Sequence, residues 1–236
     1  MERRNGGGGG FCSFPLLFAV AASFVVAVLA RVLYVLYHTG RPLRSKKGVR
    51  PLRTLIILGS GGHTAEMLNL LAVLDKDKFN PRFYISAITD SMSLQKAEVY
   101  EESIAPQNTG TGDEMNPAHF MKIYRSREVG QSYITSVGTT IVAIIHALWL
   151  TFKIRPQVVI CNGPGTCIPL CVCSFLLKVV GIRWSSIFYV ESIARVKKLS
   201  LSGFLLYHLR MADQLFVQWP YLKTKHPRAL YVGRLM

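Results

Sequence analysis

Two glycine-rich segments of this sequence are placed where a fold can bind an anion. Segment 59–64 reads GSGGHT and segment 161–166 reads CNGPGT, and each follows a short apolar run. Glycine permits positive φ angles and a close backbone approach, and the N–H groups of a following helix favour negative charge. We therefore expect a phosphate or diphosphate at these loops; a purely structural tight turn is the alternative for the first. The expected diphosphate-binding residues are Gly59, Ser60, Gly61, Gly62, Thr64, Arg125, Arg127, Asn162, Gly163, Gly165 and Thr166.

Two titratable side chains accompany this expected anion site, and we predict both as catalytic. His63 follows the first glycines; an imidazole with an ordinary pKa of about 6.5 is mostly neutral at pH 7 and can accept a proton from an attacking hydroxyl. Capping the helix or orienting a phosphate is the equal alternative. Glu191 directly follows the apolar run 187–190, where a carboxylate can bind sugar hydroxyls or act as a base. A salt bridge to Arg195, one helical turn on, is the alternative for Glu191.

Other polar residues near these loops admit two interpretations. Asp90 ends an apolar run and is either the N-cap of the next helix, which we favour, or a ribose-binding acid. Arg125 and Arg127 suit a diphosphate, whereas pairing with Glu101, Glu102 or Glu128 would be structural. The first loop also begins like a dinucleotide fingerprint, but Thr64 stands where its third glycine would be. A membrane-bound nucleotide-dependent oxidoreductase is thus the weaker functional alternative. The second loop carries Thr166, which we expect to cap the following helix.

The elements around these loops alternate between strand and helix patterns. Short apolar runs are typical of parallel strands covered on both faces, and the segments between them have helical spacing. This alternation predicts an α/β fold, a Rossmann-like parallel sheet with helices on both faces. The expected strands are 54–58, 83–88, 120–124, 158–161, 187–190, 215–217 and 230–232, and the expected helices are near 62–74, 92–103, 131–152, 166–180 and 199–210, with a surface loop at 106–117.

Length and charge limit the classes of protein. The 236 residues are too few for two full α/β domains, and 50 % hydrophobic residues exclude disorder. The formal charge of +15 is unevenly spread: nine basic residues and one acid lie in 1–53, and twelve basic residues and two acids lie in 129–236. Such a charge on a chain with only 17 % charged residues points to a membrane or a phosphate-rich partner.

The N-terminal part reads as a membrane anchor. After a glycine-rich head, 1–10, the run 11–37 is apolar enough to span a bilayer, and it is long for the rival interpretation, a cleaved signal peptide. Basic residues follow it in the linker 38–53 without any acid, so the positive-inside rule places the domain 54–236 in the cytosol. The uncharged stretch 129–152 is too polar for a second span; we expect a buried helix whose apolar end, 141–150, also rests on the bilayer.

The cysteines and the metal-binding residue types give no sign of a metal centre. The five cysteines are Cys12, Cys161, Cys167, Cys171 and Cys173, and their spacing does not match paired zinc ligands. Buried reduced thiols are the expectation for a domain in the cytosol. We expect no metal and no cofactor.

Several motifs in fixed order resemble one known family. They are GSGGHT at 59–64, RSREV at 125–129, CNGPGTCIP at 161–169, YVES at 189–192, LSLSG at 199–203, VQWP at 217–220 and YVGR at 231–234. Together they closely resemble the asparagine-linked glycosylation protein fourteen family, over about residues 54–236. That family is the membrane-anchor subunit of the eukaryotic UDP-N-acetylglucosamine (UDP-GlcNAc) transferase that adds the second GlcNAc to dolichol diphosphate-GlcNAc.

This resemblance implies half of a GT-B glycosyltransferase. The chain looks like the acceptor-side Rossmann half, similar to that half of the bacterial enzyme acting on an undecaprenyl-diphosphate precursor. There a glycine-loop histidine, matched by His63, is a proposed base or diphosphate contact, and an acid in a His-Glu-Gln-Asn segment is matched by Glu191. The flanking residues of that segment differ here, because Tyr189 and Val190 precede Glu191 and Ser192 follows it.

The same resemblance implies a divided enzyme that is inactive as this chain alone. A soluble catalytic subunit would bind UDP-GlcNAc, and this chain would recruit it to the cytosolic face of the endoplasmic reticulum and of the continuous nuclear envelope. We expect dolichol-diphosphate-GlcNAc as the acceptor and no nucleic-acid partner. A pure membrane adapter with no catalytic residues is the alternative. The expected partner interface is Leu230, Tyr231, Val232, Gly233, Arg234, Leu235 and Met236.

Overall fold

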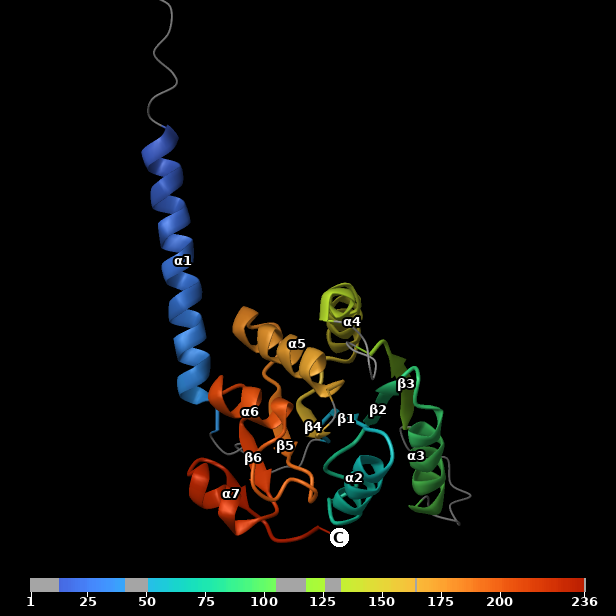
Figure 1. Cartoon of the computed structure of the whole chain (residues 1–236). Coiled ribbons are helices and arrows are strands. Elements are labelled where there is room, and N and C mark those ends of the chain that lie inside the picture. Colours follow the sequence, from blue (N-terminus) through green and yellow to red (C-terminus); the bar gives the residue numbers. More distant parts are fainter. Residues whose placement is uncertain (1–12, 41–50, 105–117, 126–132, 164, 236) are drawn as a thin grey trace, which may run out of the picture. The chain divides into compact units, whose positions relative to one another are not determined.

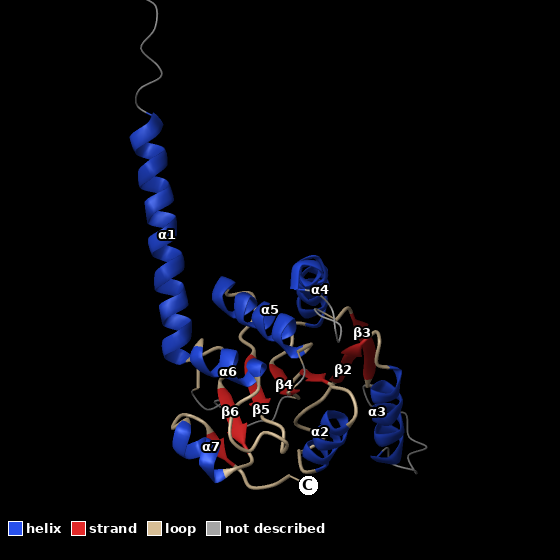
Figure 2. Cartoon of the chain, viewed as in Figure 1, coloured by secondary structure: helices blue, strands red, loops and turns tan. Residues whose placement is uncertain are grey.

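The chain forms two compact units, residues 1–38 and 39–236. The computed structural model describes residues 13–40, 51–104, 118–125, 133–163 and 165–235. The first unit is the helix α1, Ser13–His38, and it is long and apolar enough to cross a membrane, as the sequence predicts. The remaining elements form the second unit, in which strands and helices alternate along the chain (Figure 2). The expected surface loop 106–117 lies outside the described residues.

The second unit is built on one parallel sheet of seven strands in the order β3-β2-β1-β4-β5-β6-β7. Every neighbouring pair is parallel, and all seven strands coincide with predicted ones to within one or two residues. The strands are β1 Thr54–Ile57, β2 Arg82–Ala87, β3 His119–Ile123, β4 Val158–Asn162, β5 Ser186–Val190, β6 Gln214–Val217 and β7 Leu230–Tyr231. The predicted α/β class and parallel sheet are therefore confirmed.

Helices cover both faces of this sheet (Figure 1). Strand residues alternate between the faces: Leu55 and Ile57 pack with α4 to α7, whereas Ile56 and Leu58 pack with α2 and α3. The helices are α2 Gly62–Ala72, α3 Ser91–Ile104, α4 Tyr133–Ile154, α5 Cys167–Val180, α6 Leu201–His208 and α7 Pro220–Lys225. Helix α7 was not predicted, although proline is common at the first position of a helix and Pro220 begins this one.

Helix α4 is buried on one side only. It was expected to be a buried helix whose apolar end, 141–150, also rests on the bilayer, and one side does pack on the domain, through residues such as Ala143, Ala147 and Leu150. The other side exposes large apolar side chains: Ile141, Val142, Ile145, Leu148, Trp149 and Phe152. All of these but Phe152 lie within 141–150, the apolar end expected to rest on the bilayer, and the contact with the bilayer stays a prediction.

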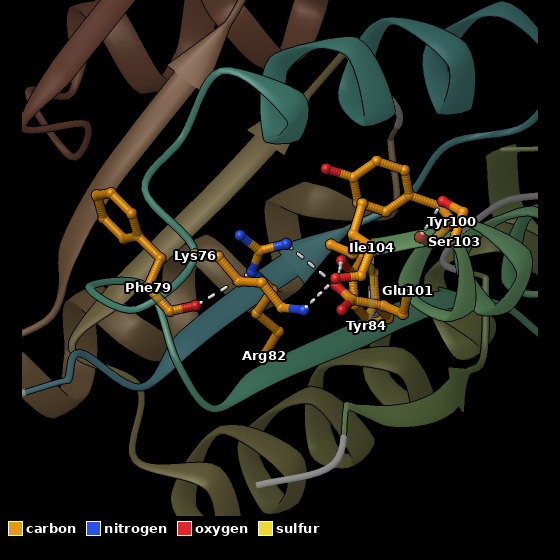
Figure 3. A network of polar contacts seen from close by, with 8 residues as sticks. All are labelled: Lys76, Phe79, Arg82, Tyr84, Tyr100, Glu101, Ser103 and Ile104. Carbon is orange, nitrogen blue, oxygen red and sulfur yellow. Dashed lines mark hydrogen bonds and ion pairs between the residues drawn. The ribbon is translucent and has the colours of Figure 1, made fainter. Parts of the chain in front are cut away.

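A buried polar network holds α3 against β2 (Figure 3). The guanidinium of Arg82 donates to the Glu101 carboxylate at 3.1 Å, and the Tyr84 hydroxyl donates to the same oxygen. Arg82 also donates to the Phe79 carbonyl. Glu101, one of the glutamates considered for Arg125 and Arg127, is therefore held by Arg82. This network ties the beginning of β2 to the last turn of α3.

The four described cysteines are free and buried, as predicted. The Sγ atoms of Cys161 and Cys171 lie 3.6 Å apart, between β4 and α5. Burial raises the pKa of the Cys161 thiol, whereas hydrogen bonds from its neighbouring thiols lower the pKa of Cys167. Cys12 lies outside the described residues.

Candidate active site

The strand order places the two glycine loops next to each other. The chain runs outward from β1 to β3, returns, and continues from β4 on the other side of β1, so β1 and β4 are neighbours where the order reverses. In open parallel sheets, ligands bind at the carboxyl ends of the strands at such a point. The loops 58–61 after β1 and 163–166 after β4 both lie there, which brings together the two segments predicted to bind a diphosphate.

The first loop leads directly into α2. Gly61 is the N-cap of this helix and has a φ of 64°, a conformation that favours glycine. A Cβ added to Gly61 or Gly62 would meet no atom within 4 Å, so both backbones border open space. The N–H groups of Gly62 and His63 belong to the first turn of α2 and have no carbonyl of that helix to bond. This geometry gives an anion two backbone donors and the positive end of a helix.

The second loop holds the ring of His63. His63 Nδ1 lies 3.1 Å from Asn162 Oδ1, at the end of β4. Gly163 has a φ of 70°, and a Cβ there would lie 2.6 Å from Cε1 of His63 and 2.9 Å from its Nδ1. The imidazole therefore rests directly on the Gly163 backbone, and only glycine leaves room for it. Pro164 lies outside the described residues, and Gly165 borders open space.

A third residue of this cluster, Glu66, is absent from the sequence-based site. It lies on α2, its side chain is 3 % exposed, and its Oε2 accepts a hydrogen bond from Asn162 Nδ2 at 2.8 Å. Its Oε1 accepts from Ser192 Oγ at 2.9 Å and from the Ile193 N–H at 3.2 Å. Glu66 thereby ties α2 to the loops after β4 and β5. The sequence signal for Glu66 is weak. Glu66 lies four residues before the apolar Leu70, a spacing that places two side chains on the same face of a helix.

Glu191, which the sequence predicts as catalytic together with His63, is fully buried at 0 % exposure. Its Oε2 accepts from the Ser200 N–H at 2.9 Å and from Ser200 Oγ at 3.1 Å, and its Oε1 accepts from the Ser192 N–H at 3.3 Å. Burial raises the pKa of this carboxyl, and the Ser200 backbone bond partly opposes that shift. A Cβ on Gly203 would collide with its Oε2, which explains the glycine of the LSLSG segment.

This environment favours a structural role for Glu191, which anchors the N-terminus of α6 to β5. Within the described residues its side chain bonds serines and Tyr189, and no ion pair with Arg195 is found. The alternative interpretation of Glu191, a salt bridge to Arg195, is therefore not what these residues form. The catalytic role of Glu191 stays a prediction that no observation in the structure tests directly.

Two expected helix caps have different outcomes. Asp90 Oδ1 accepts a hydrogen bond from the Ser93 N–H at 3.1 Å, so the favoured N-cap interpretation is confirmed. The Ser93 hydroxyl in turn donates to Asp90 Oδ2 at 2.6 Å and lies 2.7 Å from Thr64 Oγ1, whose hydroxyl donates to the Gly59 carbonyl. The prediction for Thr166 is wrong: it precedes α5 in a helical conformation and makes no side-chain cap bond. Its backbone angles carry the chain straight into the helix, so the hydroxyl is not aimed at the free N–H groups.

Of the remaining predicted residues, those that the structure describes lie away from the glycine loops. Arg125 follows β3, which is two strands from β1 and hence about 10 Å away at the backbone. Arg127 and Met236 lie outside the described residues. Leu230 and Tyr231 form β7 at the opposite edge of the sheet, and the tail then turns back, with the Leu235 N–H donating to Gln218 Oε1 at 3.0 Å.

The tail borders an apolar cavity of about 250 Å³. The cavity lies between residues of α2, of the strands β4 to β6 and of the C-terminal tail. Figure 1 shows the C-terminal end of the chain near α2. Its lining residues are Leu70, Leu74, Phe79, Ile160, Phe188, Val190, Phe216, Val232 and Leu235. The sequence-predicted interface therefore contributes Val232 and Leu235 to a hydrophobic surface.

The site contains no evident metal centre. Across the ranges that the structure describes, no group of three or more His, Cys, Asp or Glu side chains is arranged to hold a metal ion. The chemistry that the geometry offers is anion binding by backbone N–H groups, with one imidazole beside the anion.

Sequence comparison identifies close relatives over nearly the whole chain. The family model described as "Oligosaccharide biosynthesis protein Alg14 like" matches residues 54–235. The UDP-N-acetylglucosamine transferase subunit ALG14 of Mus musculus is 44 % identical over 95 % of this chain and 99 % of its own length. The protein of that name from Homo sapiens is 40 % identical over 94 % and 98 %, and the one from Yarrowia lipolytica is 40 % identical over 93 % and 98 %.

Structural comparison supports the fold. The crystal structure of MurG from Acinetobacter baumannii superposes with a TM-score of 0.51, at 12 % sequence identity. The match covers 72 % of this chain and 43 % of that chain. The likeness at this identity concerns the fold, and it agrees with the predicted GT-B half.

Proposed function

The chain belongs to the Alg14 family of oligosaccharide biosynthesis proteins, and from that membership we propose that it is the membrane-anchor subunit of a UDP-GlcNAc transferase. The observation that carries the proposal is the match to the mouse subunit, which runs over nearly the full length of both chains and so includes both units. The reaction is transfer of the second GlcNAc onto dolichol-diphosphate-GlcNAc. A soluble subunit binds UDP-GlcNAc, and this chain supplies the acceptor side.

A transfer assay of the reconstituted enzyme tests this function. The chain alone should transfer no GlcNAc from UDP-GlcNAc to the lipid acceptor, and adding the soluble subunit should restore transfer. Full activity of the soluble subunit on membrane acceptor without this chain would contradict the proposal.

We propose the endoplasmic reticulum membrane as the location, with the second unit in the cytosol. Support comes from the apolar helix α1 and from the basic residues that follow it in the sequence. Protease added to sealed microsomes should digest the domain without detergent. Protection of the domain until detergent is added would place it in the lumen.

The exposed apolar side of α4 supports a second membrane contact. A chain lacking residues 1–40 should remain partly bound to membranes, and aspartate at Ile145 and Trp149, which are 63 % and 57 % exposed, should release it. Val99→Asp, at an exposed apolar position on α3, is the matched control and should leave binding unchanged. Release by the control, or equal binding of all variants, would contradict this contact.

The acceptor diphosphate is proposed to bind at the two glycine loops, with His63 beside it. The support is the juxtaposition of open backbone at Gly61 and Gly62 with the imidazole on Gly163. In the reconstituted enzyme, His63→Ala should lower transfer while both subunits remain bound. Wild-type transfer by that variant would remove the catalytic part of the proposal.

The adapter alternative makes an opposite prediction at the same loop. If the chain only anchors its partner, Gly61→Val should leave transfer intact as long as membrane attachment and partner binding survive. If the loop binds the acceptor, the valine side chain at a φ of 64° blocks the backbone donors and transfer falls.

The C-terminal tail is proposed as a partner interface. Val232 and Leu235 border an apolar cavity that an apolar segment of the soluble subunit can fill. Deleting 232–236, or introducing Leu235→Asp, should abolish co-purification of the two subunits. Val196→Asp, at an exposed apolar position elsewhere, is the control and should retain the partner. Co-purification of the deletion variant would refute this interface.

A further inference from the structure

The hydrogen bonds around Glu66 determine which way the Asn162 amide points. Glu66 Oε2 lies 2.8 Å from Asn162 Nδ2, and an ionised carboxylate can only accept. Its other oxygen accepts from the Ile193 N–H and from Ser192 Oγ, whose own oxygen accepts from the Ala194 N–H at 3.3 Å. Every group that faces Glu66 is therefore a donor. The NH₂ group of Asn162 must point toward Glu66, and its carbonyl oxygen must point away.

The Asn162 amide in turn determines the tautomer of His63. Asn162 Oδ1 faces His63 Nδ1 at 3.1 Å, and an amide oxygen can only accept a hydrogen bond. His63 Nδ1 must therefore carry the proton. In the neutral ring, Nε2 is then left with the lone pair, and within the described residues Nε2 has no hydrogen-bond partner.

Gly163 keeps the ring in this orientation. The imidazole lies against the Gly163 backbone, where a Cβ would be 2.6 Å from Cε1 and 3.3 Å from Nε2. The ring is thus supported on one side by backbone and held at Nδ1 by the amide. Its Nε2 is the atom available to a ligand at the glycine loops.

We propose that Glu66 is a positioning residue that sets His63, through Asn162, in the Nδ1–H tautomer with Nε2 as proton acceptor. This inference deepens the proposed function, because it rests on a ligand being bound beside His63. Glu66 touches no ligand itself. It acts as the acidic member of a Glu–Asn–His chain, as a buried carboxylate orients a catalytic imidazole in other enzymes.

The direct test is the tautomer of His63 in the full chain co-purified with its soluble subunit. Histidine labelled with nitrogen-15 is observed at a pH of about 8, well above the ordinary histidine pKa, and the His63 signals are assigned by their loss in His63→Ala. We expect the Nδ1–H form in the wild type. Glu66→Gln can donate to Asn162, lets the amide turn over, and should shift His63 toward the Nε2–H form.

Ser192→Ala is the matched control. It removes a different hydrogen bond to Glu66, at Oε1, and leaves the contact between Glu66 Oε2 and Asn162 in place. This control should keep the Nδ1–H form, even if it lowers the unfolding temperature. If Glu66→Gln does not fold, Asn162→Ala gives the same test, because it removes the acceptor at His63 Nδ1.

Transfer kinetics separate this inference from the proposed function. Glu66→Gln should lower kcat by about 100-fold, the lower end of what a general base contributes, with a smaller effect on the KM of the lipid acceptor. In a His63→Ala background it should cause no further loss. An Nε2–H tautomer in the wild type, or an unchanged tautomer in folded Glu66→Gln, would overturn the inference. If Glu66→Gln does not fold, an unchanged tautomer in Asn162→Ala would overturn it. The expected tautomer with normal transfer by His63→Ala would support the inference and refute the catalytic role of His63.

Discussion

Replacing Gly163 by alanine should displace His63. The φ of 70° places a non-glycine residue in the left-handed region, which costs about 1–2 kcal/mol. The new Cβ would also lie 2.6 Å from His63 Cε1, so the ring must move and lose its 3.1 Å contact with Asn162. A lost hydrogen bond of this kind costs about 0.5–1.5 kcal/mol. Together the two effects amount to about 1.5–3.5 kcal/mol.

Two other glycines separate these two effects. Gly61 has a φ of 64°, and a Cβ added there would meet no atom within 4 Å. Gly61→Ala should therefore lose only the free energy that the left-handed backbone conformation costs. Gly165→Ala has neither the positive φ nor a contact, and should leave the Tm unchanged or raise it slightly. Gly163→Ala should therefore unfold below Gly61→Ala by about 1–6 °C, since each kcal/mol shifts the Tm of a domain of this size by about 2–4 °C.

The assay is thermal unfolding of the full chain with its soluble subunit, monitored by tryptophan fluorescence. The His63 nitrogen-15 signals of the same samples report whether the ring has moved. Equal Tm values for Gly163→Ala and Gly61→Ala, together with unchanged His63 signals in Gly163→Ala, would refute the reasoning.

Three further predictions concern the buried polar groups. Lys178→Met should lower the free energy of unfolding by about 3–5 kcal/mol, because the buried Asp213 carboxylate, 2.7 Å from the Lys178 ammonium, would lose its cation. Chemical unfolding measures this loss, and a loss below about 1 kcal/mol would contradict the prediction. Burial raises the pKa of Glu191 above its ordinary 4.5, so its protonated form stabilises the fold below that pH and this contribution is lost as the pH rises through the raised pKa. The Tm of the wild type relative to Glu191→Gln should therefore fall as the pH rises above 4.5, and a flat difference would contradict the shift. In a Cys12→Ser variant the four buried thiols should react with Ellman's reagent no faster than the domain unfolds, whereas rapid reaction of the folded chain would show them accessible.

Much of the fold was predictable because its signals are local. Seven short apolar runs separated by helical segments indicated the parallel sheet, and glycines after two of them indicated two loops at the carboxyl ends of strands. The Asp90 cap followed from side-chain type and position. The same reasoning failed for Thr166, because a cap depends on the backbone angles of the residue as well as its hydroxyl. For α4 the uncharged stretch did not show which residues face the domain, because composition does not say which neighbours a helix receives.

The sequence by itself determined the anchor helix, the α/β class and both glycine loops, with His63 beside the first, since each depends on residues close together in the chain. The tertiary structure alone decided which groups meet. Asn162 reaches His63 across 99 positions and Glu66 across 96, and Glu66 reaches Ser192 across 126. These contacts depend on β1, β4 and β5 being neighbours in the sheet. Hydrogen bonds require donor and acceptor within about 3 Å, so the role of Glu66 and the tautomer of His63 emerge only once the strand order is known.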